Sequence, residues 1–263
     1  MAFEANLEAK ITSYYRKRMK AEYLAISGLD LAEMLMRRSL EKKRGVYQKT
    51  EEEDWRYESI RRLSEGLEVA DHQEKLGDGT VTITIKPEPA LRNVNRLTEE
   101  DWERVLEVGN IPEEYWPELI ESYQDWIDID DIPRTYGAET EDYYSTLPVP
   151  YKAKNGPLDT VEELLLIKGF TPVILYGGSL GQTSELDNVE SDNNKIMVSG
   201  IYDLLTTFGD GKVNVNAASE RVLRTLPDID SVDAGAIIEE REGTVDEKGN
   251  RIDTSFKNVN DFM

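Results

Sequence analysis

A long stretch without proline, Glu4 to Ser39, lies near the start of the sequence and sets the first limit on its fold. Apolar and small residues recur in it at helical spacing, which predicts one long helix. One stripe of this helix combines large with small side chains and would let another element approach closely: Leu24, Gly28, Leu31 and Leu35. The stripe favours packing against the rest of the same domain, and a partner interface is the alternative.

The following residues, up to about 90, add a short helix and a strand. A charged segment contains an expected helix from about Asp54 to Leu67, and Gly77-Asp78-Gly79 gives a turn. In "TVTITI", Val81, Ile83 and Ile85 alternate with polar residues, so the predicted strand has one buried face. The first part of the chain is therefore expected to combine a long helix with at least one strand.

Residues 91–126 read mainly as helices, and their beginning is repeated later in the chain. The two segments are "RNVNRLTEEDWERVL" and "VNVNAASERVLRTL". Each runs from Val-Asn through a Thr or Ser cap and an acidic first turn into an apolar helix, and a second amphipathic helix follows. This repetition predicts an internal duplication of a helical hairpin. We expect three regions: residues 1–90 with the long helix and strand, a helical subdomain over 91–195, and a second hairpin subdomain over 196–263.

The composition excludes several classes of site. The 263 residues include no cysteine, which excludes disulfides, thiolate metal sites and cysteine nucleophiles. A single histidine, His72, excludes His-rich zinc sites. No window approaches the ~18 apolar residues that a membrane span needs, so the chain as given is expected to be soluble.

Helical hairpins often bind nucleic acid, and this function remains the alternative. Lys+Arg 31 against Asp+Glu 53 gives a formal net charge of -22, which repels phosphate. The turn of the second hairpin, "LPDIDSVDAG", would also present Asp228, Asp230 and Asp233 to a phosphate backbone. We therefore expect the hairpin to be a packing module.

One motif suggests catalysis. The run "GGSLG", Gly177 to Gly181, has the G-x-S-x-G spacing of a hydrolase nucleophile elbow. That elbow needs a helix directly after the serine and a histidine later in the chain. Here "QTSELDNVE" follows the motif and His72 precedes Ser179, so we expect no enzymatic activity.

Carboxylates gather in the loop that follows the first helical hairpin. They are Asp125, Asp128, Asp130, Asp131, Glu139, Glu141 and Asp142. A hard cation with six to eight oxygen ligands would relieve their mutual repulsion, so Ca²⁺ is a possible cofactor. Solvated carboxylates paired with Arg134 or with tyrosine hydroxyls are the alternative. A second oxygen-rich tract is a weaker candidate and is expected to be a mobile loop: Asp187, Asn188, Glu190, Asp192 and Asn193.

Three segments carry a family resemblance. They are "DWIDIDDIPRTYGAETEDYYSTLPVPYKAKNGPLDTVEELLLIKGFTP", "VSGIYDLLTTFGDGKVNVNAAS" and "EYLAISGLDLAEMLM". The first resembles the central signature of type II secretion system protein K, the large minor pseudopilin of the general secretion pathway. The second is similar to the next block of that family, and the third to its helix just beyond the membrane segment.

The resemblance implies a pilin-like α+β body with a large inserted helical domain of SAM-like hairpins. It implies a structural protein at the pseudopilus tip in the periplasm, assembled through its N-terminal helix with the I, J and H types of minor pseudopilin. Family members begin with a cleaved leader and an inner-membrane half-helix, and they continue into further strands at the other end. We expect this sequence to lack the leader and half-helix at its start and the further strands at its end. They can also bind calcium in the helical domain, which we map onto Asp128, Asp130, Asp131, Glu139 and Asp142.

Overall fold

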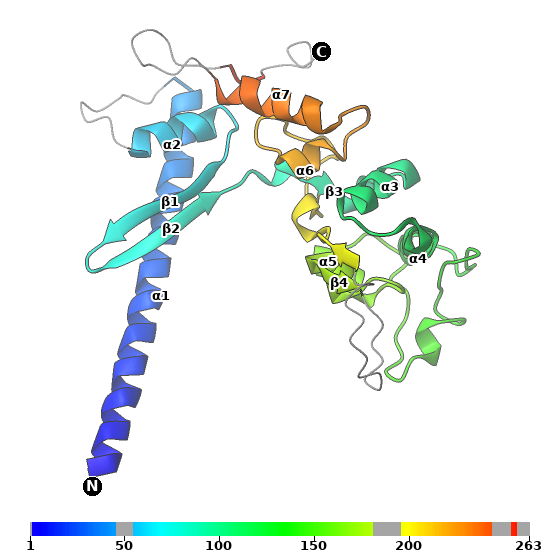
Figure 1. Ribbon diagram of the computed structural model, residues 1–263, viewed down its shortest axis with the longest axis horizontal. Helices are drawn as coiled ribbons and strands as arrows, with labels where there is room; N and C mark the ends of the chain where they lie inside the picture. The colour runs from blue at the N-terminus through cyan, green and yellow to red at the C-terminus, as the bar shows by residue number, and fades with distance from the viewer. Residues whose placement is uncertain (1, 46–54, 181–195, 244–253, 257–263) are drawn as a thin grey trace. The chain divides into compact units, whose positions relative to one another are not determined.

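The computed structural model describes residues 2–45, 55–180, 196–243 and 254–256. The chain divides into two compact units, Met1–Pro87 and Glu88–Met263. Figure 1 shows a long helix with a strand hairpin in the first unit, and short helices joined by loops in the second.

The described residues of the first unit form two helices and one hairpin. Helix α1 (Ala2–Lys43) is followed by α2 (Trp55–Ser64), and the antiparallel strands β1 (Val69–Leu76) and β2 (Gly79–Ile85) form the hairpin. The predicted long N-terminal helix is confirmed. No helix in the ranges described above is both long and apolar enough to cross a membrane.

Strand β1 is the element that the sequence pattern did not predict. Its run "VADHQEKL" is polar, and a register shift lies between Val69 and His72, where Asp71 has a positive φ of 43°. His72 pairs with Ile83 of β2 and stacks on Trp55 of α2, with ring centroids 3.6 Å apart. The strand forms because β2 supplies an apolar partner, and not because its own residues alternate.

Helix α1 lies directly against β2. A Cβ atom on Gly28 would be 2.6 Å from Cγ2 of Val81, and a Cβ atom on Gly79 would overlap the Leu24 side chain. Lys20 forms an ion pair with Asp78 at the hairpin turn. The helix can approach the hairpin this closely because glycine stands at both contact points.

The second unit is built from short helices and strand pairs. Its α-helices are α3 (Glu99–Val108), α4 (Trp116–Ile127), α5 (Pro172–Tyr176), α6 (Glu220–Leu223) and α7 (Ser231–Glu242). Its 3-10 helices are η1 (Glu88–Ala90), η2 (Val94–Arg96), η3 (Glu113–Tyr115), η4 (Tyr144–Thr146), η5 (Val161–Leu166) and η7 (Tyr202–Leu204). Strands β3 (Arg92–Asn93) and β6 (Leu205–Thr206) pair in parallel, and β4 (Gly178–Leu180) pairs with β5 (Ile196–Val198) antiparallel.

One hydrophobic core runs through the second unit. Trp102 of α3 packs against Tyr123 of α4, with ring centroids 4.8 Å apart, and Trp126 of α4 packs edge-on against Tyr144. Leu223 of α6 belongs to the same core. The two helical subdomains that the sequence separates at residue 195 therefore share one core. Mixed helices and small sheets confirm the α+β fold class.

Gly28→Val tests the contact between α1 and β2. The added side chain would displace Val81, and overpacking of this kind destabilises by about 1–3 kcal/mol. Native-state hydrogen exchange of the β2 amides would measure the loss. Gly235→Val is the control, because a Cβ atom there meets nothing within 4 Å. Equal protection of β2 in both variants would contradict the close approach.

Candidate functional site

The acidic loop begins where α4 ends. Asp128 is the C-cap residue of α4, and its extended backbone, with ψ of 176°, turns the chain out of the helix. The loop then bends back toward α4, and Tyr136 N donates to Glu121 Oε2 of that helix at 2.6 Å. Carboxylates from the helix end and from the loop therefore come close together.

Asp125 and Arg134 hold the loop against the helix. Asp125 is fully buried, and it accepts hydrogen bonds from the main-chain N–H of Arg134, at 3.0 Å, and from the Arg134 guanidinium. The same guanidinium reaches Asp128 Oδ2 at 2.7 Å. A Cβ atom at Gly137 would overlap the Asp125 carboxylate. The predicted pairing of loop carboxylates with Arg134 thus holds for these two aspartates.

Three carboxylates that the sequence selected converge at this place. Single oxygen atoms of Asp128, Asp130 and Glu139 all lie within 4.8 Å of one another. Glu139 is 1% exposed, and both of its carboxylate oxygens are buried without a hydrogen-bond partner, as is Oδ1 of Asp128. Buried oxygen atoms without donors are costly, and a bound cation would satisfy them.

The pKa of Glu139 is raised from 4.5 to about 7, chiefly by burial and in addition by the negative charges of Asp125 and Asp128. A carboxylate with this environment binds a proton readily near neutral pH. A cation would compete with that proton, because metal ligands must be deprotonated.

The other two predicted ligands make different contacts. Asp142 Oδ1 accepts a hydrogen bond from the main-chain N–H of Glu139 at 2.8 Å, and Asp131 Oδ1 accepts one from Asn155 Nδ2 at 3.2 Å. Asn155 was missed at the sequence level. Its Oδ1 is buried without a partner, and its backbone has a positive φ of 49°. Its contact with Asp131 leaves no spacing signal, because the two residues are 24 positions apart in the sequence.

The residues of the hydrolase-like motif and the single histidine have other surroundings. Ser179 lies inside the short strand β4, opposite Met197 of β5, and not at a strand-to-helix turn. His72 is engaged in the other unit by Trp55. The second oxygen-rich tract, residues 187–193, lies outside the described residues.

In the second hairpin, the helix N-terminus that could bind phosphate is already capped by the chain itself. Asp230 is the N-cap of α7, and its Oδ1 accepts from Val232 N at 2.6 Å and from Asp233 N at 2.9 Å. These amides are the donors that a phosphate would use at a helix N-terminus. The chain's own carboxylate occupies them, which disfavours nucleic-acid binding there.

The predicted partner stripe of α1 packs inside the first unit. Leu35 is fully buried, Gly28 is buried against Val81, and Leu24 and Leu31 are half-buried. The structure therefore places these four residues in intramolecular packing, which the stripe favours over an intermolecular groove. Their contact with a partner stays a prediction.

A second apolar stripe of α1 was missed. We call it the outer stripe, and its exposed members are Ile11, Tyr15, Met19, Ile26, Leu29, Met36 and Leu40. With 3.6 residues per turn, their spacing places them on the side of the helix away from β2. Leu29 is 69% exposed. An apolar stripe of this length on an exposed helix is typical of an interaction surface.

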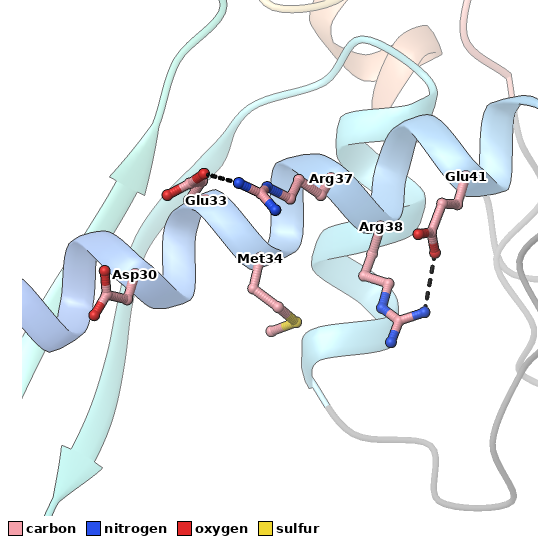
Figure 2. A pocket seen from close by; sticks show the side chains of 6 residues that line it. All are labelled: Asp30, Glu33, Met34, Arg37, Arg38 and Glu41. Carbon is pink, nitrogen blue, oxygen red and sulfur yellow. Dashed lines mark hydrogen bonds and ion pairs between the residues drawn. The ribbon is translucent and has the colours of Figure 1, made fainter.

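A shallow pocket on the same helix carries no site of its own. Figure 2 shows its lining side chains, Asp30, Glu33, Met34, Arg37, Arg38 and Glu41. Arg37 pairs with Glu33 at 2.5 Å and Arg38 with Glu41 at 2.9 Å, both within the helix. Its arginines are thus already engaged by neighbours.

Comparisons with known proteins give one family match and one structural likeness. Residues 86–176 match the family model described as "Type II secretion system (T2SS), protein K". The chain is also similar to a solved structure described as the crystal structure of the GspK-GspI-GspJ complex from enterotoxigenic Escherichia coli Type 2 Secretion System. That likeness has a TM-score of 0.54 at 15% sequence identity and covers 94% of this chain and 76% of that chain. No curated protein matches the chain.

Glu139→Gln tests the electrostatics of the acidic loop. Between pH 4.5 and 7 the folded carboxyl holds a proton that the unfolded one has lost, so the free energy of unfolding falls as pH rises through this window. The glutamine variant should lack this decrease. Urea unfolding with chelator at about pH 5 and about pH 8 would measure it. Glu141→Gln, at an exposed neighbour, is the control, and parallel pH profiles for all three proteins would contradict the buried position of Glu139.

Proposed function

We propose that this chain, whose predicted resemblance to type II secretion system protein K is confirmed by the family match, works as the K-type minor pseudopilin. The observation that carries the proposal is the match over residues 86–176, since it covers the acidic loop and the first helical hairpin. The fold supports it independently over nearly the whole chain. The protein is a structural component of protein secretion, and no comparison supports a nucleic-acid-binding role.

The protein acts at the tip of the pseudopilus, by assembly and without catalysis. Ser179 lies within strand β4 and not at a strand-to-helix turn, which supports this assignment. The working location is the periplasm, with an anchor in the inner membrane, as the resemblance implies. The long helix α1 supports this location because pseudopilins assemble through such a helix.

The partners are the other minor pseudopilins. The similar solved structure is a complex with I- and J-type proteins, and the H type is the further candidate that the resemblance implies. The outer stripe of α1 is the surface that fits such a partner, because its apolar side chains are exposed while the inner ones pack on β2. Burying it against another helix would remove that apolar surface from water.

Calcium is the cofactor that the acidic loop would hold. Asp128, Asp130 and Glu139 supply convergent oxygens, and Asp131 and Asn155 lie in the same loop cluster. Ca²⁺ prefers such an all-oxygen set of carboxylates and carbonyls. The ion would stabilise the loop by satisfying the buried oxygens of Glu139, and the role is structural.

Leu29→Arg tests the partner surface. The wild-type chain, mixed with I- and J-type minor pseudopilins, should elute with them in size exclusion. An arginine in the outer stripe should weaken the complex roughly tenfold or more, because a charge would be buried without a partner. Val232→Arg is the control, since Val232 is 75% exposed in the other unit.

The outcomes separate the two claims. Failure of the wild-type chain to bind either pseudopilin would contradict the K-type assignment. Unchanged binding by Leu29→Arg would retain the assignment and remove the outer stripe as the contact surface.

Calcium addition tests the metal assignment. At a hundredfold excess over Kd, an ion that binds the folded state alone raises its stability by about 2.7 kcal/mol. We expect a higher unfolding midpoint with Ca²⁺ than with chelator for the wild type and for Glu141→Gln, and no response for Glu139→Gln. A response that survives in Glu139→Gln would place the ion elsewhere.

A further inference from the structure

The two helical hairpins begin with the same three residues, Asn-Val-Asn, at 93–95 and at 214–216. In each copy the first side chain accepts from the main-chain N–H of the second asparagine. The distance is 3.0 Å from Asn95 N to Asn93 Oδ1, and 3.1 Å from Asn216 N to Asn214 Oδ1. A capped helix follows at the same spacing, with Thr98 or Ser219 as N-cap. The duplication that the sequence predicts thus extends to hydrogen bonds.

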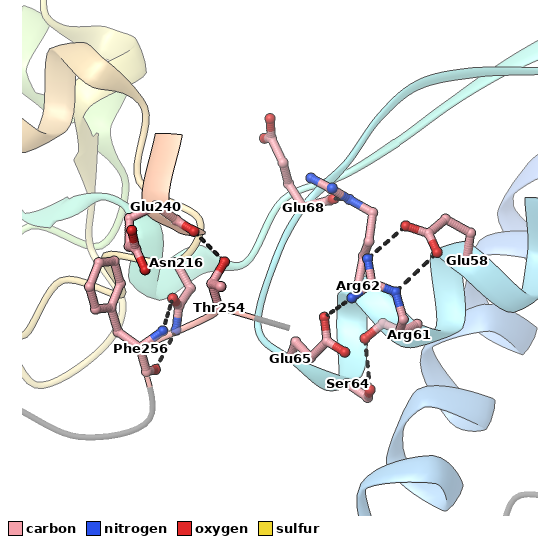
Figure 3. A network of polar contacts seen from close by, with 10 residues as sticks. All are labelled: Glu58, Arg61, Arg62, Ser64, Glu65, Glu68, Asn216, Glu240, Thr254 and Phe256. Carbon is pink, nitrogen blue, oxygen red and sulfur yellow. Dashed lines mark hydrogen bonds and ion pairs between the residues drawn. The ribbon is translucent and has the colours of Figure 1, made fainter. Parts of the chain in front are cut away.

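The second asparagine of each copy binds the main chain of one distant residue. Asn95 donates to Leu158 O at 2.9 Å and accepts from Leu158 N at 2.7 Å. Asn216 donates to Phe256 O at 2.8 Å and accepts from Phe256 N at 2.8 Å (Figure 3). One carboxamide therefore satisfies both main-chain groups of an apolar residue, as a neighbouring strand does.

We propose that the second hairpin is a binding site for extended peptide main chain, and that its occupant is the chain's own segment Thr254–Phe256. This inference does not depend on the role in secretion. Asn216 is 8% exposed, and Ser255 within the segment is equally buried. Both hydrogen bonds of Asn216 go to main-chain atoms of Phe256, so the contact does not depend on which side chain stands at that position.

The segment Thr254–Phe256 contacts both the second Asn-Val-Asn sequence and α7. Thr254 Oγ1 donates to the carbonyl of Glu240 near the end of α7. The adjacent Arg241 donates to Val215 O at 2.7 Å and to Ala218 O at 2.6 Å, which ties the same helix to the motif. The segment and Arg241 thus both hold the C-terminal end of α7 in place. Release of the segment would remove one of these two attachments.

The absence of cysteine from the chain allows a direct test. In a Ser255→Cys background the introduced thiol should react slowly with a maleimide, because position 255 is covered. Adding Asn216→Ala should speed labelling by roughly tenfold or more, since two hydrogen bonds to the segment are lost. Asn95→Ala, which removes the equivalent pair at Leu158, is the matched control and should leave the rate unchanged.

Equal labelling rates with Asn216→Ala and Asn95→Ala would overturn the proposal. If circular dichroism shows that Asn216→Ala has unfolded, Phe256→Pro tests the same contact from the other side, because proline lacks the N–H that Asn216 accepts. Fast labelling in a folded Phe256→Pro protein supports the site, and slow labelling overturns it.

A capped peptide with the sequence of residues 253–258 should bind Phe256→Pro in trans and should fail to bind when Asn216→Ala is added. Binding by both proteins would place the peptide elsewhere and overturn the proposal.

Discussion

The acidic loop depends on one interaction, the pairing of the buried Asp125 carboxylate with Arg134. A buried charge is stable only when it is paired and hydrogen-bonded, and Arg134 supplies both a guanidinium and a main-chain N–H. This pairing holds the loop against α4, and Gly137 leaves the space that the carboxylate fills. The loop then places Glu139 beside Asp128, so one ion pair creates a cluster of like charges that needs a proton or a cation.

Helix α1 shows how one element serves two purposes. Its inner side uses Gly28 to approach β2, and its outer side leaves Leu29 exposed. Gly28 on the inner side contacts Val81 of the hairpin, whereas the charged pair Glu33–Arg37 lies among the exposed apolar residues of the outer side.

Local signals predicted much of the fold. The long helix, the turn before β2 and the Thr98 cap follow from spacing and from cap chemistry, and each of them forms. Strand β1 was missed because its polar run around His72 carries no alternation, and it forms only against a partner strand. In the candidate site, three acidic residues could be selected by their density, whereas Asn155 is brought near by the path of the loop.

The sequence by itself determined the helices, their caps, the duplicated Asn-Val-Asn hairpins and the resemblance to protein K, because each depends on residues that are near one another in the chain. Tertiary structure decided which stripe of α1 is covered, which carboxylates converge and how strongly Glu139 is buried. It also decided that Asn216 binds Phe256. These properties depend on distances between residues far apart in sequence, and only the folded chain fixes such distances.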